Sequence, residues 1–191
     1  MSGVRALTKA EIKEIKDSFT GRYALRNLTM FILMIKSGFR ISEILSLKVK
    51  DVFRNGQMTN SIEVERKNMK GKKSGRVVPF HPEAKNSIQA WLLERGNPQP
   101  EQFLFKSQKG ENSPIQRAQA YRILKACYIA CGLLGKLGCH STRKHFAEAI
   151  FPLLGKDLLK LKVALGHRSI DSTIRYIAVS QKEVDEAALR L

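Results

Sequence analysis

Apolar residues recur every three or four positions along most of this chain, and that spacing is typical of helices with one buried face. The clearest such run covers residues 22–37, where one face carries Leu25, Leu28, Ile32 and Ile35. Gly38 follows it as a left-handed terminus. The same spacing predicts further helices at about 83–95, 114–132, 141–151, 157–165 and 171–179. We therefore expect a mainly helical protein.

Local signals mark where some of these helices begin and end. Thr8 and Glu11 form a capping box, so a further helix is predicted to start directly after Thr8. Ser113 followed by Pro114 is typical of a helix N-terminus, because proline suits the first helical position. Gly132 is the predicted stop of the helix that Ser113 opens.

One part of the chain departs from the helical spacing. Residues 61–66 alternate apolar and polar side chains, and residues 76–80 resume a strand-like pattern, which together predict an antiparallel β-hairpin. Its tip contains no acidic residue, and its basic side chains are Arg66, Lys67, Lys70, Lys72, Lys73 and Arg76. Such a run is either a solvated loop or a grip on phosphates. The predicted fold class is thus mainly α with a small antiparallel β-hairpin.

The charge of the chain narrows the class of partner. Lys and Arg number 34 against 17 Asp and Glu, giving a net charge of +17 in 191 residues. A protein this basic is expected to bind a polyanion such as double-stranded DNA. The chain contains no run of about 18 apolar residues, which a membrane-spanning helix would need. Residues 1–10 also lack the apolar region of a secretory signal. We therefore expect a cytoplasmic protein with no membrane partner.

The three cysteines are expected to be reduced and structural. Cys127 and Cys131 lie four residues apart on a predicted helix, with Cys139 and His140 downstream, so a zinc site is conceivable. Their spacing fits no common zinc pattern, and free cysteine behaves most often as a small buried apolar residue. We predict no metal site and no cofactor.

Several polar residues stand where a predicted helix starts or ends. His140 and Arg143 lie three apart at a helix start, so both side chains share a face and can meet one phosphate. Arg40 comes just after a helix end, with Glu43 three residues onward. Arginine suits phosphate because its planar fork makes two parallel hydrogen bonds. Each pair taken alone also fits an ordinary ion pair or a surface histidine.

Tyr176 is the candidate nucleophile. It lies on the last predicted helix beside Ile174 and Ile177, where an isolated tyrosine is more often a half-buried packing residue. A phenol is only about one part in a thousand ionised at pH 7, so attack on phosphorus needs a base or a strongly cationic site. Such a cationic site would be formed by Arg40 and Arg143, by His140 and His167, and by the basic hairpin tip.

Three segments, in this order, resemble the catalytic segments of the tyrosine recombinase, or phage integrase, family: residues 38–45, 140–143 and 165–176. The family's first arginine, His-x-x-Arg box, second histidine and nucleophile correspond in turn to Arg40, His140 with Arg143, His167 and Tyr176. Its hairpin lysine corresponds to Lys67 or Lys70, and strand alternation leaves both open.

The resemblance implies a site-specific DNA recombinase or integrase with the tyrosine recombinase catalytic-domain fold. In that family the tyrosine attacks the scissile phosphate, forms a 3′-phosphotyrosyl link and releases a 5′-hydroxyl, without metal or ATP. The arginines and the second histidine would stabilise the transition state, His140 would help move the tyrosine proton, and Glu43 would orient an arginine. One hairpin lysine would protonate the departing oxygen, and the tip's other basic residues would hold DNA: Arg66, Lys72, Lys73 and Arg76.

We expect one catalytic domain over residues 1–191, with a core to about residue 180 and a tail at 181–191. We expect the family's N-terminal core-binding domain to be absent, as in either an excised catalytic domain or the compact fimbrial phase-variation recombinases. The tail is expected either to pack on its own domain or to dock on a neighbouring protomer. A homotetramer is expected on DNA, and the free protein is expected to be a monomer or to self-associate weakly.

Two other functions fit parts of the sequence. A type IB topoisomerase uses a similar set of side chains, but that family usually has lysine at the position of His140. A basic DNA-binding protein without catalysis explains the charge equally well. It does not explain why five candidate residues occur at family spacing.

Overall fold

The computed structural model describes residues 3–64, 76–177 and 188–189, with Val64 and Arg76 given by their backbone alone. The chain divides into two compact units, Met1–Phe146 (unit 1) and Ala147–Leu191 (unit 2). The predicted single domain over the whole chain, with its tail at 181–191, stays a prediction.

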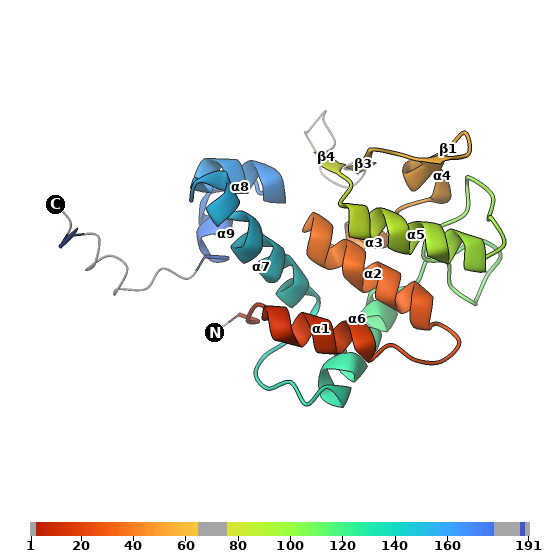
Figure 1. Ribbon diagram of the computed structural model, residues 1–191, viewed down its shortest axis with the longest axis horizontal. Coiled ribbons are helices and arrows are strands. Elements are labelled where there is room, and N and C mark those ends of the chain that lie inside the picture. The colour runs from red at the N-terminus through yellow and green to blue at the C-terminus, as the bar shows by residue number, and fades with distance from the viewer. Residues whose placement is uncertain (1–2, 65–75, 178–187, 190–191) are drawn as a thin grey trace. The chain divides into compact units, whose positions relative to one another are not determined.

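Unit 1 is built around a pair of packed helices. Its described helices are α1 (Lys9–Asp17), α2 (Ala24–Ser37), α3 (Ile41–Leu45), α4 (Val49–Val52), α5 (Pro82–Glu94), α6 (Arg117–Ala130) and the first part of α7 (Cys139–Ile150). Helices α2 and α5 lie side by side (Figure 1), and Met30, Phe31 and Met34 on α2 are fully buried. A helix that is apolar on nearly every side belongs in a core, so α2 forms the centre of unit 1.

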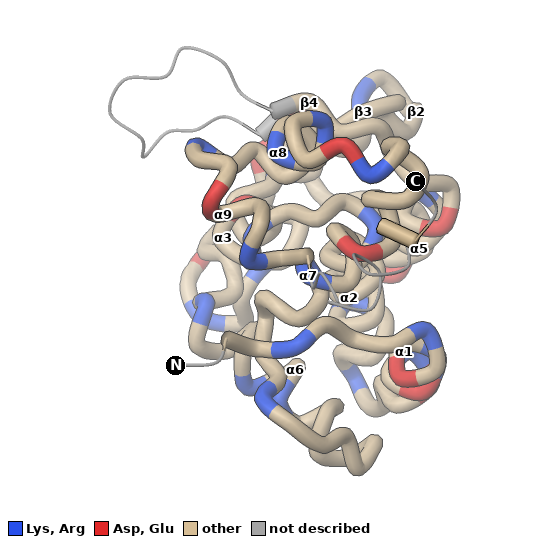
Figure 2. Tube along the Cα trace, turned by 90° about the vertical axis from the view of Figure 1, so that its left-hand side faces the viewer, with Lys and Arg blue, Asp and Glu red and all other residues tan. Residues whose placement is uncertain are grey.

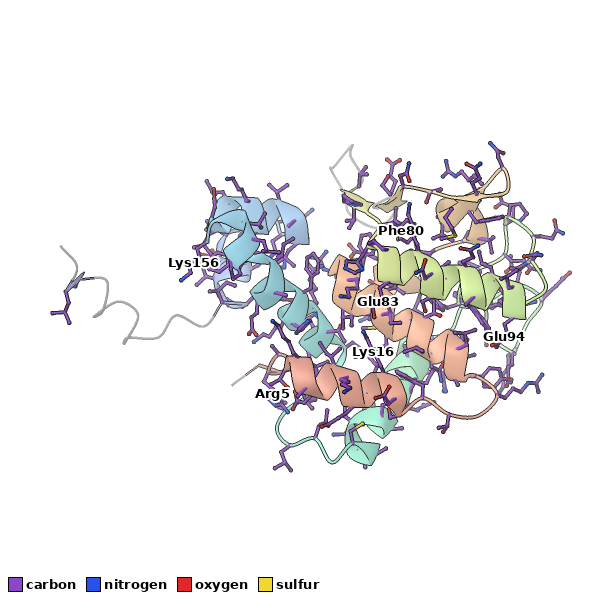
Figure 3. The ribbon with its side chains drawn as sticks, viewed as in Figure 1. Arg5, Lys16, Phe80, Glu83, Glu94 and Lys156 are labelled. Atoms are coloured by element: carbon purple, nitrogen blue, oxygen red, sulfur yellow. The ribbon has the colours of Figure 1, made fainter. Side chains whose placement is uncertain are left out.

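One carboxylate joins three helices of unit 1. Glu83, at the start of α5, accepts a hydrogen bond from Lys16 on α1 (Figure 3). Its Oε2 also forms an ion pair with the Lys36 ammonium on α2, at 3.0 Å. Burial raises the pKa of Glu83, but the two ammonium groups more than offset it, and the net shift is downward. The carboxylate is therefore charged at neutral pH and fixes the end of α2 from which the Arg40 segment departs.

The predicted hairpin is confirmed. Strand β3 (Ser61–Val64) pairs antiparallel with β4 (Arg76–Pro79), and Ile62 lies opposite Val78. Ile62 is 1% exposed, so the alternation read from the sequence turns one side of β3 into the core.

A second small sheet was not among the predicted elements. Strand β1 (Phe53–Arg54) pairs antiparallel with β2 (Gln57–Met58). The turn between them is Asn55-Gly56, with φ of 51° and 77°. Two positive φ values are typical of a tight hairpin turn, and Asn-Gly is its strongest sequence signal. The turn signal was therefore present in the sequence, but the two strands that it joins are too short to show an alternation of apolar and polar residues.

Two of the predicted helix ends are confirmed. The Thr8 side chain accepts from the backbone N–H of Glu11, and the Glu11 carboxylate accepts from the backbone N–H of Thr8, so the capping box forms at the start of α1. Gly38 ends α2 with a φ of 60°.

The prediction that Ser113 and Pro114 open a helix is wrong. Helix α6 begins at Arg117, and Pro114 lies in an antiparallel bridge with Lys106. The backbone N–H of Ser107 donates to the carbonyl oxygen of Ser113 at 2.7 Å, so the chain here is extended and paired. Pairing with the segment around Lys106 thus overrides a helix-start signal that is confined to two adjacent residues.

Unit 2 contains the end of α7, a short 3₁₀ turn (Pro152–Leu154), α8 (Leu158–Leu165) and α9 (Asp171–Ile174). Leu161 and Leu165 form the buried side of α8. The prediction of a last helix over residues 171–179 is wrong in its length, because α9 ends at Ile174 and Tyr176 lies in the turn that follows. Residues 178–179 lie outside the described part of the chain.

Candidate active site

Arg143 links two distant segments of unit 1. It lies on α7, is 1% exposed, and donates a hydrogen bond from Nη1 to the carbonyl oxygen of Gly38, 105 residues earlier in the sequence. Gly38 ends α2 two residues before Arg40. This hydrogen bond therefore holds the box at residues 140–143 next to the segment that carries Arg40.

Arg40 stands at the start of α3 and contacts Glu43. Glu43 Oε2 accepts from the backbone N–H of Arg40 at 2.6 Å, and Oε1 accepts from Arg40 Nη1 at 3.2 Å. The Arg40 side chain is 36% exposed, so it reaches solvent while Glu43 holds its base. This contact is the one that an orienting role for Glu43 requires, and the role itself stays a prediction.

His140 stands in the first turn of α7 among several cations, and Figure 2 shows Lys and Arg in blue on both α6 and α7. Partial burial, and then the positive charges of Arg143 and Arg40, lower the pKa of His140 below its ordinary value. Arg117 on α6 and Lys144 act in the same direction. His140 itself is exposed at the surface of the protein. His140 is thus neutral at pH 7 and can accept a proton.

The position of Gly38 requires a glycine for two reasons. Its φ of 60° lies in the left-handed region, which other residues rarely adopt. A Cβ at this position would also overlap the Phe146 ring. Phe146 follows Arg143 on α7, so the absence of a side chain at Gly38 lets α7 approach the end of α2.

We expect Gly38→Ala to lower the free energy of unfolding by about 2–4 kcal/mol, from left-handed strain together with overpacking. Urea unfolding followed by circular dichroism would measure the loss. Gly132→Ala is the matched control, because Gly132 has a φ of 63° and nothing lies within 4 Å of an added Cβ. Equal losses in the two variants would show that contact with Phe146 contributes nothing.

In unit 2, the end of α8 sets the place of His167. Gly166 has a φ of 62°, and its N–H donates to the carbonyl oxygen of Val163 at 2.9 Å. The N–H of His167 donates to the carbonyl oxygen of Lys162 at 3.0 Å. These two hydrogen bonds form a Schellman motif, so a local sequence signal turns the chain and fixes the His167 backbone.

His167 and Tyr176 lie together in unit 2. The His167 side chain is 8% exposed, and its Nδ1 lies 2.9 Å from the Thr173 hydroxyl. The Tyr176 ring meets the imidazole edge-on, with the ring centroids 5.0 Å apart. Thr173 is fully buried, so it holds the imidazole in one orientation beside the tyrosine.

The hairpin tip cannot be compared with its prediction. Arg66, Lys67, Lys70, Lys72 and Lys73 lie outside the described residues, and Arg76 is described by its backbone as the first residue of β4. The choice between Lys67 and Lys70 therefore stays open.

The cysteines carry free thiols, and Cys127 is buried. Within residues 3–64, 76–177 and 188–189, no three His, Cys, Asp or Glu side chains gather as metal ligands. The described part of the chain also contains no helix with the length and apolar character needed to cross a bilayer.

Comparison with known proteins decides the family. Residues 5–183 match the sequence profile of the phage integrase family. The chain belongs to the phage integrase family. A relative in this family, the probable integrase/recombinase YoeC of Bacillus subtilis, is 34% identical over 179 residues, covering 93% of this chain and 90% of YoeC. The type 1 fimbriae regulatory protein FimE of Escherichia coli is 29% identical over 184 residues, covering 93% of this chain and 87% of FimE.

Solved structures of the phage integrase family share the fold. The XerH site-specific recombinase, in a post-cleavage complex with its palindromic difH substrate, superposes with a TM-score of 0.74 at 26% identity. The match covers 96% of this chain but 51% of XerH, so this chain spans about half the length of that relative. These matches confirm the predicted family, the tyrosine recombinase catalytic-domain fold and the class of enzyme.

Sequence reasoning missed the residues that hold the candidate catalytic side chains. Thr173 contacts His167, and Arg117 adds charge beside His140, yet neither stands in a recognisable motif. Phe146 and Gly38 meet only in the folded protein. The glycine itself was predicted as a helix end, and its second role depends on a contact between residues far apart in the sequence.

Proposed function

We propose that this chain cleaves and rejoins double-stranded DNA at specific sites, as the catalytic part of a tyrosine recombinase. The observation that carries the proposal is the convergence of Arg40, His140 and Arg143 in unit 1, although the first is a hundred residues from the other two. A cluster of fixed arginines beside a neutral histidine suits a phosphodiester, whose negative charge grows in the transition state.

In the proposed reaction Tyr176 is the nucleophile. Its Oη forms a bond to the scissile phosphorus, the bond from phosphorus to the 5′ oxygen breaks, and the DNA 3′ end is left as a phosphotyrosyl ester. The phenolic proton passes to His140, whose lowered pKa keeps it neutral and able to accept. A 5′-hydroxyl from another strand then attacks the ester and releases Tyr176, so the phosphodiester energy is conserved and no ATP is consumed.

The arginines take the role that a metal ion plays in many phosphoryl-transfer enzymes. Arg40 and Arg143 would each donate two parallel hydrogen bonds to the non-bridging oxygens, and His167 would donate a further one. The Thr173 contact at His167 and the Glu43 contact at Arg40 support these roles, because both fix a donor before the substrate arrives. Fixed donors stabilise the pentacoordinate state without reorganisation.

The leaving 5′ oxygen needs a proton, and we assign it to Lys67 or Lys70. A 5′-thio substrate, which has sulfur in place of the 5′ oxygen, shows which of the two lysines is the general acid, because a thiol with a pKa of about 8.5 departs without a proton. We expect Ala at one of these positions to slow cleavage of normal DNA by about 10²–10⁴-fold and to cleave the 5′-thio substrate normally. Ala at the other position should behave as wild type on both substrates. Slow cleavage of both substrates by every variant would remove the general-acid role.

DNA binding by this chain is expected to depend strongly on salt. The net charge of +17 favours contacts to phosphates that release counterions. We assign such contacts to the hairpin residues Arg66, Lys72, Lys73 and Arg76, which position DNA without reading its sequence. On DNA we propose a homotetramer, with the free protein monomeric or weakly associated. The tail at residues 181–191 either packs on its own protomer or docks on the next.

The experiment that tests the proposed function uses nicked suicide substrates from the DNA that flanks this coding sequence. A denaturing gel would reveal a covalent protein–DNA adduct, because loss of the short nicked strand traps the phosphotyrosyl ester. We expect the adduct to form equally with and without EDTA and without ATP. An adduct that required a divalent metal would contradict this mechanism. Relaxed plasmid without recombinant product would favour a topoisomerase instead.

A further inference from the structure

The first described residues of the chain make contacts that the reaction above does not use. Residues 3–7, here named the N-terminal strap, run beside the loop that leads into α7. The N–H of Arg5 donates to the carbonyl oxygen of Lys136 at 3.0 Å, and Arg5 Nε donates to the carbonyl oxygen of Leu134 at 2.9 Å. Gly135 has a φ of 89°, and a Cβ there would lie 3.0 Å from Arg5 Nε. The loop before α7 is therefore shaped around the Arg5 side chain.

The same arginine ties the strap to α1. Arg5 Nη1 and Nη2 donate to the two carboxylate oxygens of Glu11 at 2.9 and 2.6 Å, a bidentate pair (Figure 3 shows Arg5 at the N-terminal end of α1). The hydrogen bonds from Arg5 hold the pKa of Glu11 down to about 2. The pair is therefore intact at any pH at which DNA cleavage would be assayed.

The second anchor of the strap lies on α7 itself. The carbonyl oxygen of Leu7 lies 2.8 Å from Nδ1 of His145, and the Leu7 side chain is 2% exposed. Burial lowers the pKa of His145 and outweighs the upward effect of the Leu7 carbonyl, and the charges of Lys36 and Lys9 add smaller downward effects. The imidazole is thus neutral at pH 7. Because a carbonyl can only accept, the ring proton must sit on Nδ1.

The two anchors bracket the His-x-x-Arg box. One anchor holds the loop just before α7 begins at Cys139, and the other holds His145 in the second turn of the helix. His140 and Arg143 lie between them. We propose that the N-terminal strap positions α7, with Arg5 and His145 as positioning residues that set how His140 and Arg143 stand against Arg40. The effect on cleavage rests on the proposed function.

The physical reason for the proposal is the sensitivity of such a site to small displacements. A shift of about 1 Å in a group that binds the reacting phosphate can cost about 100-fold in rate. Helix α7 meets α2 through the close approach of Phe146 to Gly38 and the Arg143 hydrogen bond, both on one side of the helix. The strap supplies a second support, at the helix start and at His145, so losing it would let α7 tilt without unfolding unit 1.

Single-turnover cleavage of a saturating suicide substrate would test the strap. We expect Arg5→Ala and His145→Leu to slow adduct formation by about tenfold or more, with the half-saturating DNA concentration within about twofold of wild type. His145→Asn should restore most of the rate, because its amide nitrogen can donate to Leu7 from the place of Nδ1. Lys13→Ala removes a charge from the exposed side of α1 and is the control that should not change the rate. A wild-type rate in His145→Leu would overturn the proposal.

A second measurement needs no cleavage and so separates this proposal from the proposed function. Titration of the four histidines by NMR reports the pKa of His140, which depends on its distances from Arg143, Arg40 and Arg117. We expect His145→Leu to shift this pKa and His145→Asn to leave it at the wild-type value. A shifted pKa in a protein that never forms an adduct would support the strap and refute the recombinase mechanism. Adduct formation by the wild type, together with an unshifted His140 pKa in His145→Leu, would support the recombinase mechanism and refute the strap.

Discussion

Tyr176→Phe is expected to abolish the covalent protein–DNA adduct completely while leaving DNA binding close to normal. The substitution removes the one oxygen that forms the ester. It keeps the ring that packs edge-on against His167, so the local structure should persist. A suicide-substrate gel would measure the adduct, and a salt titration of DNA binding would measure the affinity. The slope with salt should be unchanged, because the phosphate contacts come from basic side chains elsewhere.

The other tyrosines provide the controls for this result. Phe in place of Tyr23, Tyr121 or Tyr128 removes the same hydroxyl group from a residue of unit 1, and each variant should form the adduct at the wild-type rate. Tyr128 is the strictest comparison, because its ring is 1% exposed and its hydroxyl donates to the carbonyl oxygen of Gly138 at 3.4 Å. An adduct in Tyr176→Phe would remove Tyr176 from the mechanism and direct the search to these three.

Arg143→Lys is expected to slow cleavage by about 10²–10³-fold, the usual cost of losing one donor to a developing anion. Lysine keeps the positive charge but replaces the planar fork with a single ammonium group, so it cannot hold Gly38 and a phosphate oxygen in the same geometry. The cleavage rate should be measured below the temperature at which the variant unfolds and expressed per folded molecule. This would separate the loss of the donor from any loss of stability.

Arg95→Lys is the matched control for Arg143→Lys. Arg95 is likewise an arginine of unit 1 that donates to backbone carbonyls, although it is only partly buried, and its Nη1 donates to the carbonyl oxygens of Phe103 and Leu104 at 2.9 and 3.0 Å. It takes no part in the candidate active site. We expect this variant to lose stability while its cleavage rate stays within about twofold of wild type. Equal rate losses in both variants would mean that Arg143 acts through the fold alone.

Features that depend on neighbouring residues were predictable from the sequence. The capping box of Thr8 and Glu11, the left-handed Gly38 and the alternation in β3 are each set within a few residues, and the structure confirms them. Ser113 and Pro114 carried an equally clear local signal that failed, because pairing with the segment around Lys106 holds that stretch extended. Local signals were therefore reliable only where no distant partner competed.

The same division applies to the candidate active site. Arg40, His140, Arg143, His167 and Tyr176 were predicted because three short segments of the sequence resemble the catalytic segments of the family. The contacts that position them were not found, because Arg143 with Gly38 and His145 with Leu7 join segments more than a hundred residues apart. A single sequence contains no record of which distant residues touch.

The tyrosine neighbourhood and the arginine cluster differ in how they are held. His167, Thr173 and Tyr176 are joined within a ten-residue stretch, whereas Arg143 reaches Gly38 across 105 residues. Opening of unit 1 would separate the guanidinium groups while the phenol and its imidazole stayed together. In the proposed mechanism an isolated phenol is inert toward a phosphodiester at neutral pH. A copy in which unit 1 has opened would therefore not cut DNA, even while Tyr176 and His167 stayed in contact.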